Sequence, residues 1–190
     1  MSAARHELIL GGQRSGKSRC AEARAVDWLA APGHSAVLLA TALAGDDEMR
    51  ERIRRHQFDR ARRVPELVAE EVPRELARAV DFHTAPSRLV VVDCLTLWLT
   101  NLSMPLSGLA LDAHACDTAR RALCAALQRA RGPVLLVSNE IGMGLSPMSA
   151  AARHFVDELG RLHQHVAAQC ERVTLMVAGI ELPVKRGALA

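Results

Sequence analysis

A run of eight residues near the amino end of the chain has the composition and spacing of a phosphate-binding loop. It fits the pattern G-x-x-x-x-G-K-[ST] at every fixed position and lies between a predicted strand and a predicted helix. The residues are Gly11, Gly12, Gln13, Arg14, Ser15, Gly16, Lys17 and Ser18. Backbone N–H groups of such a loop surround an anion, to which the following helix presents its positive end. We expect Lys17 to reach the β- and γ-phosphates of a nucleotide and the Ser18 hydroxyl to bind Mg²⁺.

Asp93 is a second candidate, because it ends the most uniformly apolar run of the chain, residues 88–93. Carboxylates at the carboxyl ends of buried strands lie where α/β sheets bind ligands. At that place Asp93 can hold Mg²⁺ directly or through water. The alternative interpretation is that Asp93 caps a helix that follows it.

His56 is a candidate nucleophile in a charged helix predicted over residues 46–62. Helical spacing puts Met49, Ile53 and His56 on one face of this helix. Arg52 and Arg60 lie four residues to either side of His56. Their positive charges disfavour the imidazolium form, and a neutral imidazole can attack phosphorus to form a covalent phosphoramidate. The same arginines can hold the phosphates of the attacked nucleotide.

Two other interpretations of this helix stay open on the pattern alone. A single helical histidine is more often structural or solvated than catalytic. The seven arginines between Arg50 and Arg63 fit a solvated face or a stripe that binds nucleic acid. Against nucleic acid, Glu51 and Asp59 interrupt the stripe, and Phe58 is the one aromatic residue available for stacking on a base.

The elements that position these residues follow from apolar runs that alternate with amphipathic stretches, a pattern typical of a parallel sheet with crossover helices. We expect strands at residues 7–10, 35–40, 67–71, 88–93, 134–137 and 172–178. We expect helices at residues 17–31, 46–62, 73–82, 111–131 and 148–169, with Pro73 in a first turn. The predicted result is a three-layer α/β fold.

Composition limits the class of protein. The chain has 190 residues, of which 49% are hydrophobic and 24% charged, so we expect one globular domain over residues 1–190 and no intrinsic disorder. No apolar run is long enough to span a membrane, and residues 1–8 do not resemble a signal peptide, so the expected location is the cytoplasm. Five widely spaced cysteines without a C-x-x-C motif predict small buried side chains. The net charge of +3 is too weak to require a nucleic-acid partner but suits an anionic small molecule.

Four ordered motifs together resemble the bifunctional adenosylcobinamide kinase / adenosylcobinamide-phosphate guanylyltransferase family of cobalamin assembly. The loop Gly11–Ser18 is similar to the family's G-G-x-R-S-G-K-S, and Asp47–His56 to its D-E-M-x-x-R-I-x-x-H. The segment 92–102, which contains Asp93, resembles a further strand-and-helix signature. Ser138–Gly144 resembles [ST]-N-E-x-G-x-G. The resemblance covers nearly the whole chain.

The resemblance implies roles for residues at matching positions. His56 would be the nucleophile that carries GMP, and the loop would bind the triphosphate. The further nucleotide-binding residues would be Thr41, Ala42, Leu43, Gln57, Phe58, Asp59, Arg60, Glu70 and Asp93. It also implies a P-loop NTPase fold with a RecA-like core, GTP, ATP and adenosylcobinamide as substrates, and a homo-oligomer, for which trimers are the known form. The chain departs from the Leu-Asn-Gln that the family often has in its penultimate helix, because here His163 stands between Leu162 and Gln164, in the helix predicted over residues 148–169.

Three other functions stay open at this stage. The nearest is a small-molecule kinase that uses the same loop without a covalent step. A RecA-like ATPase acting on nucleic acid and a nucleotide-binding regulatory module are the others. The sequence indicates neither the residues that bind the corrinoid nor a general base for the kinase step.

Overall fold

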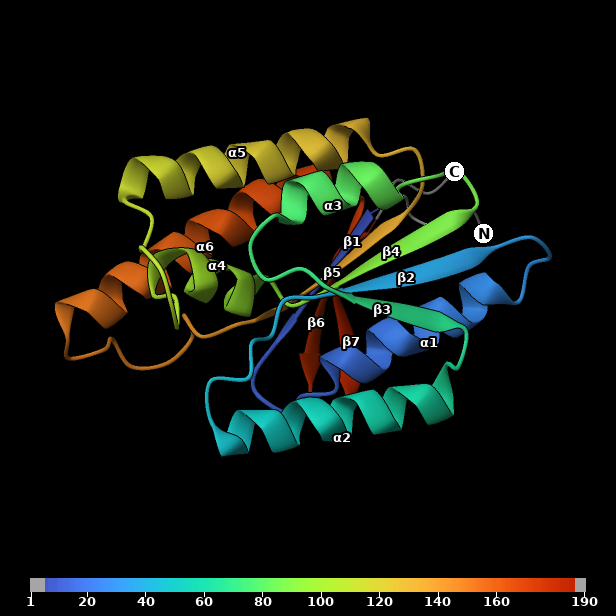
Figure 1. Ribbon diagram of the computed structural model, residues 1–190, viewed down its shortest axis with the longest axis horizontal. Helices are drawn as coiled ribbons and strands as arrows, with labels where there is room; N and C mark the ends of the chain where they lie inside the picture. The colour runs from blue at the N-terminus through green and yellow to red at the C-terminus, as the bar shows by residue number, and fades with distance from the viewer. Residues whose placement is uncertain (1–5, 187–190) are drawn as a thin grey trace.

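The computed structural model describes residues 6–186, whose strands form one seven-stranded sheet in the order β3-β2-β4-β5-β1-β6-β7 (Figure 1). The strands are β1 (His6–Gly11), β2 (Ser35–Ala40), β3 (Leu67–Glu71), β4 (Arg88–Asp93), β5 (Val134–Asn139), β6 (Arg172–Val177) and β7 (Ile180–Lys185). The first six strands are parallel to one another, and β7 pairs antiparallel with β6. The carboxyl ends of β1, β5 and β4 therefore lie side by side at one edge of the sheet.

Helices cover both faces of the sheet and make the three-layer α/β fold that the sequence predicted (Figure 1). They are α1 (Lys17–Leu29), α2 (Asp47–Arg63), α3 (Leu76–His83), α4 (Leu95–Ser103), α5 (Ala113–Arg129) and α6 (Ala150–Gln169). Strand side chains alternate between two cores. In β4, Val90 and Val92 pack in the core under α3 to α6, whereas Val91 packs in the core that includes α1. Helix α2 lies on the α1 side and contains no buried residue.

Most predicted elements lie within a few residues of the observed ones, and three strands, β2, β3 and β4, match their predicted bounds. Helix α3 was predicted to begin at Pro73 but begins at Leu76. The carbonyl of Pro73 accepts a hydrogen bond from Asn101 Nδ2 at 3.0 Å, and that of Arg74 accepts one from Trp98 Nε1 at 2.8 Å. Because α4 takes both carbonyls, residues 73 and 74 do not enter a helical hydrogen-bond ladder, which starts at the Glu75 carbonyl.

Two elements were not among those predicted from hydrophobic periodicity. Helix α4 was indicated only by the strand-and-helix signature over residues 92–102, since six of its nine residues are buried and little of it faces solvent. Strand β7 is exposed along its whole length and contains Pro183, a composition that argues against a strand except at an edge.

The β6–β7 hairpin turns at Ala178 and Gly179 and supports the phosphate-binding loop. The Gly179 N–H donates to the Ser15 carbonyl at 3.0 Å, and Glu181 on β7 accepts a hydrogen bond from Arg24 on α1. Four of the five cysteines are buried, as expected. No helix among residues 6–186 is long and apolar enough to cross a membrane.

Candidate functional site

Two of the three glycines of the loop, Gly11 and Gly16, have backbone conformations that side chains rarely adopt. Gly16 precedes α1 with a φ of 100°, and Gly11 has a φ of 154°. A Cβ on Gly11 would lie 2.5 Å from Ser15 Oγ and 2.6 Å from the carbonyl oxygen of Met176. Because both values are far below van der Waals contact, glycine is required at position 11 for the loop to close over the end of β1.

Lys17, Ser18 and Asp93 meet at the mouth of this loop. The Lys17 ammonium is buried and donates to the Gly12 carbonyl at 2.6 Å, so it lies across the loop that would receive phosphate. The Ser18 hydroxyl donates to Asp93 Oδ2 at 2.8 Å, although 75 positions separate them in the sequence. Burial lowers the pKa of Lys17. Cys94 and the negative charge of Asp93 oppose that shift, whereas the positive charge of Arg52 adds to it. Asp93, which holds Ser18, and Arg52 of α2 thus both act on the charge of Lys17.

Thr41 fixes the backbone that carries Asp93. Its side chain is fully buried, its hydroxyl donates to the Cys94 carbonyl at 2.7 Å, and the same oxygen accepts from the Cys94 N–H at 2.8 Å. The Thr41 N–H donates to the Asp93 carbonyl at 3.1 Å. Asn101 Nδ2 on α4 donates to the Thr41 carbonyl at 2.7 Å. Thr41 therefore positions Asp93, while the half-buried Ala42 and Leu43 continue the chain past it.

Asn139 is a candidate that the sequence reasoning did not single out. It ends β5, the strand between the loop strand β1 and the Asp93 strand β4, and it pairs in register with Gly11. Alternation along β5 puts Asn139 on the α1 side of the sheet, because Val137 packs in that core. Asp93 lies on the same side, since Val91 packs there and Ser18 contacts it. The topological position of β5 was the missing signal.

On the opposite side of the sheet, a buried polar network holds the segment after β5. Thr96 Oγ1 lies 3.0 Å from Ser138 Oγ, which lies 2.7 Å from His163 Nε2. His163 Nδ1 lies 3.6 Å from Glu140 Oε2, and the Glu140 N–H donates to the Gly11 carbonyl at 3.0 Å. Burial lowers the pKa of His163, and the Glu140 charge opposes that shift. The residue that departs from the family pattern, His163, is thus a member of this network.

His56 lies on the surface of α2. The helix begins at a side-chain cap, because the Met49 N–H donates to Asp46 Oδ1 at 2.7 Å, and it is tied to α1 by an ion pair of 2.7 Å between Arg63 and Glu22. Within residues 6–186 the structure records no hydrogen bond of the His56 ring, which is exposed. The imidazole is therefore accessible to a nucleotide.

The other residues predicted to contact a nucleotide lie on α2 or on the edge strand β3. Gln57 and Phe58 are exposed on α2, and Asp59 forms an ion pair of 3.4 Å with Arg63. Arg60 is half-buried on the same helix. Glu70 lies on the edge strand β3 and forms an ion pair of 2.8 Å with His83 of α3, on the other face of the sheet from α2. The structure brings the loop, Ser18, Asp93 and Thr41 together but does not bring Glu70 to them.

A glycine loop after β1, a serine and an aspartate joined beneath it, and one strand inserted between their two strands define a P-loop nucleotide-binding protein. The chain belongs to the cobinamide kinase / cobinamide phosphate guanyltransferase family, whose model matches residues 7–184.

Three curated relatives are called bifunctional adenosylcobalamin biosynthesis proteins. The one from Pseudomonas aeruginosa is 46% identical over 94% of this chain and 96% of its own length. Those from Salmonella typhimurium and Escherichia coli are 38% and 37% identical, each over 94% of this chain and 98% of its own length. Among solved structures, the flagellar accessory protein FlaH of Methanocaldococcus jannaschii aligns with a TM-score of 0.49 and 10% identity over 96% of this chain and 79% of its own.

Proposed function

We propose that this chain performs both reactions of its family around one nucleotide site. It phosphorylates the aminopropanol arm of adenosylcobinamide with ATP or GTP and then transfers GMP from GTP, through His56, to give adenosylcobinamide-GDP. The observation that carries the proposal is the hydrogen bond of 2.8 Å between Ser18 and Asp93 beside the buried Lys17, within electrostatic range of Arg52 on the His56 helix.

In the kinase reaction, the acceptor hydroxyl attacks the γ-phosphorus and gives up its proton to water. A new O–P bond forms, and the bond to the leaving nucleoside diphosphate breaks. Lys17 and the loop N–H groups stabilise the negative charge that the leaving oxygens gain. Asn139 would donate its amide to a γ-phosphate oxygen, because β5 ends between the loop and Asp93. These groups would orient the triphosphate.

We propose Mg²⁺ as the cofactor of this site, held by Ser18 and Asp93. Both offer hard oxygen ligands, and Mg²⁺ usually takes only one or two protein ligands beside substrate phosphates and water. When bound, the ion would neutralise charge on the phosphate oxygens.

In the guanylyl transfer, His56 attacks the α-phosphorus of GTP, an N–P bond forms, and pyrophosphate leaves with the electrons of the broken P–O bond. The phosphate of the phosphorylated corrinoid then attacks the same phosphorus and frees the imidazole. Arg52 and Arg60 would hold the nucleotide phosphates during both displacements. The exposure of His56 supports this role, because a carrier must meet a nucleotide and later a large acceptor.

The experiment is incubation with GTP labelled in the α-phosphate, without a corrinoid. The wild type should acquire acid-labile, base-stable label, and His56→Ala should acquire none while it keeps kinase turnover. The matched control is His114→Ala, an exposed histidine on α5. Equal labelling of His56→Ala and the wild type would leave a kinase without a covalent step as the function.

We also propose a homo-oligomer, with the trimer as its form by family resemblance. The exposed Phe58, which helical spacing puts on the opposite side of α2 from His56, supports a surface that another subunit covers while His56 stays accessible. Light scattering measures the subunit number directly.

A further inference from the structure

Two loop segments of eight and nine residues contain no charged residue, in a chain in which 24% of residues are charged. They are residues 104–111, in the loop between α4 and α5 that ends at Asp112, and residues 141–149, in the loop between β5 and α6 that begins at Glu140. We call them the apolar rim. Their exposed large side chains are Met104, Leu106, Leu109, Ile141, Met143, Leu145 and Met148. Leu145 and Met148 are 99% and 98% exposed. Met104 of the first segment and Ala151, just after the second, line one cavity, so the two segments border the same site. Exposed apolar side chains gathered around a cavity indicate an interaction site.

The backbone of the rim is anchored while its apolar side chains face outward. Arg153 donates to the carbonyls of Pro147 and Met148 at 3.0 and 2.7 Å. The Leu111 N–H donates to the Leu102 carbonyl at 2.8 Å, and Arg74 reaches the Leu109 carbonyl at 3.4 Å. Hydrogen bonds to both loops therefore fix the surface that presents these side chains.

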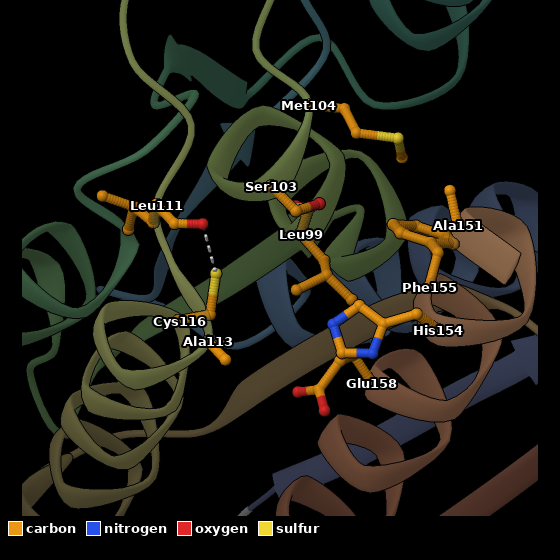
Figure 2. A pocket seen from close by; sticks show the side chains of 10 residues that line it. All are labelled: Leu99, Ser103, Met104, Leu111, Ala113, Cys116, Ala151, His154, Phe155 and Glu158. Carbon is orange, nitrogen blue, oxygen red and sulfur yellow. Dashed lines mark hydrogen bonds between the residues drawn. The ribbon is translucent and has the colours of Figure 1, made fainter.

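A cavity of about 210 Å³ opens between α4, α5 and α6 at the rim (Figure 2). Leu99, Leu111 and Phe155 line it, and Figure 2 shows His154 and Glu158 together at the end opposite Met104. Pockets that enclose a whole drug-sized ligand measure roughly 300–1,000 Å³. This cavity is smaller, so it suits one apolar edge of a ligand whose remainder lies across the rim.

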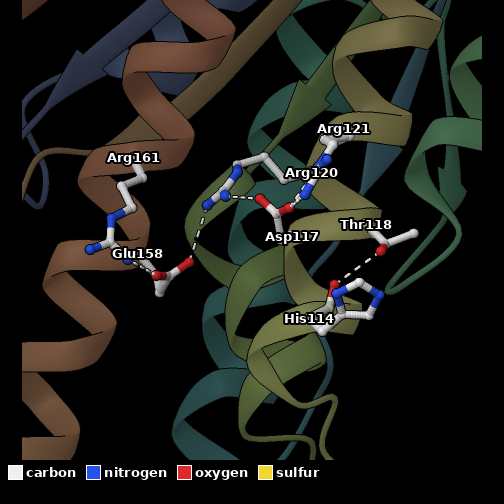
Figure 3. Close-up of polar contacts among 7 residues, drawn as sticks. All are labelled: His114, Asp117, Thr118, Arg120, Arg121, Glu158 and Arg161. Atoms are coloured by element: carbon white, nitrogen blue, oxygen red, sulfur yellow. Dashed lines mark hydrogen bonds and ion pairs between the residues drawn. The ribbon is translucent and has the colours of Figure 1, made fainter.

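The polar end of the cavity carries no uncompensated charge. Glu158 forms an ion pair of 3.1 Å with Arg120 of α5 and a second with Arg161 (Figure 3). Asp117 binds Arg120 from its other side (Figure 3). Because these contacts satisfy the carboxylate, an uncharged ligand can approach it without leaving a buried charge unpaired.

The rim adjoins the nucleotide site at two places. Leu106 packs on Gly45, in the loop that follows Thr41, so closely that a Cβ on Gly45 would lie 2.9 Å from Leu106 Cδ1. The other loop begins at Glu140, whose N–H donates to the Gly11 carbonyl at 3.0 Å. A ligand on the rim would thus extend to the edge of the sheet where the triphosphate binds.

We propose that the apolar rim and its cavity bind the corrinoid acceptor, an inference that rests on the proposed function. A corrinoid is a flat macrocycle whose edge carries methyl groups and uncharged amides. Apolar side chains match the methyl groups, and the absence of charge avoids leaving an ionised group unpaired beside neutral amides. The contacts with Gly45 and Gly11 place the peripheral arm toward the nucleotide.

The test compares Met143→Glu and Leu145→Glu with the control Phe82→Glu, which alters a side chain of similar exposure on α3. We expect each rim variant to raise the KM for adenosylcobinamide at least tenfold in the kinase assay, and Phe82→Glu to leave it unchanged. Ala151→Trp, which fills the mouth of the cavity, should act in the same direction. Labelling of His56 by GTP without corrinoid should stay at the wild-type level in all four variants, which also reports that they are folded.

Every other result overturns the inference. An unchanged KM in the rim variants would remove the rim from acceptor binding, and parallel loss of His56 labelling would make it part of the nucleotide site. A change in subunit number by light scattering would identify the rim as a contact between copies of the chain. Failure of the wild type to phosphorylate adenosylcobinamide would instead contradict the proposed function.

Discussion

The phosphate-binding loop and helix α2 carry the two reactive parts of the proposed mechanism, and the protein holds them in opposite ways. The loop joins a buried strand to a helix that packs in the core, and Lys17 beside it is only 7% exposed. Helix α2 buries no residue and is tied to α1 by the ion pair between Arg63 and Glu22. A group that stabilises charge works best when it is fixed, whereas a group that carries a nucleotide between two reactions must stay accessible.

The largest expected effect separates the two regions by chemistry. Lys17→Ala should lower kinase turnover about a thousandfold, equal to ~4 kcal/mol of barrier, because the buried ammonium lies across the loop that would receive phosphate. His56→Ala should leave kinase turnover within about twofold of the wild type. Release of ADP in the presence of adenosylcobinamide measures both. If His56→Ala were as inactive as Lys17→Ala, the two regions would not be separable.

The next effect separates them by stability. Leu136→Ala on β5 should cost about 2–5 kcal/mol of unfolding free energy, because the fully buried side chain leaves a cavity in the core. Ile53→Ala on α2 should cost about 1 kcal/mol or less, since it removes only half-buried surface. Urea unfolding of both variants gives the comparison. Equal losses would show that α2 is packed more firmly than its exposure indicates.

A smaller effect tests the support of Asp93. Thr41→Val should lower stability by about 1–3 kcal/mol and reduce kinase turnover, because the Cys94 N–H and carbonyl both lose their partner. Thr118→Val on the exposed face of α5 is the control, where we expect a change of about 0.5 kcal/mol or less. Normal turnover in a destabilised Thr41→Val protein would limit Thr41 to a structural role.

The smallest expected effect concerns the attachment of α2. Arg63→Ala should cost about 1 kcal/mol or less of stability, since the arginine is largely solvent-exposed, and the loss should shrink in high salt. We expect a slower rate of His56 labelling with unchanged kinase turnover. Arg62→Ala, which removes the neighbouring arginine that lies over the Phe58 ring, is the comparison variant. The prediction is contradicted if Arg62→Ala and Arg63→Ala slow labelling equally.

Features that depend on consecutive residues were predictable from the sequence, whereas features that depend on contacts between distant segments were not. The loop was predictable because its function depends on eight consecutive residues, and β4 because a uniformly apolar run ends in Asp93. The role of Thr41 in holding Asp93 depends on a contact between the segments that follow two neighbouring strands, β2 and β4, and no local pattern encodes that contact. Asn139 stands in the Ser138–Gly144 motif, but its place between the loop and Asp93 becomes visible only when the strand order is known. The alternation of side chains along β3 puts Glu70 on the face of the sheet opposite α2.

The hairpin that supports the loop has a consequence for folding. Glu181, which accepts a hydrogen bond from Arg24, lies 157 positions after it in the sequence, and Gly179 of the same hairpin holds the Ser15 carbonyl. Contacts between such distant segments cost more loop-closure entropy than a local turn does. The loop therefore gains its full support only when the two most distant parts of the sheet have come together.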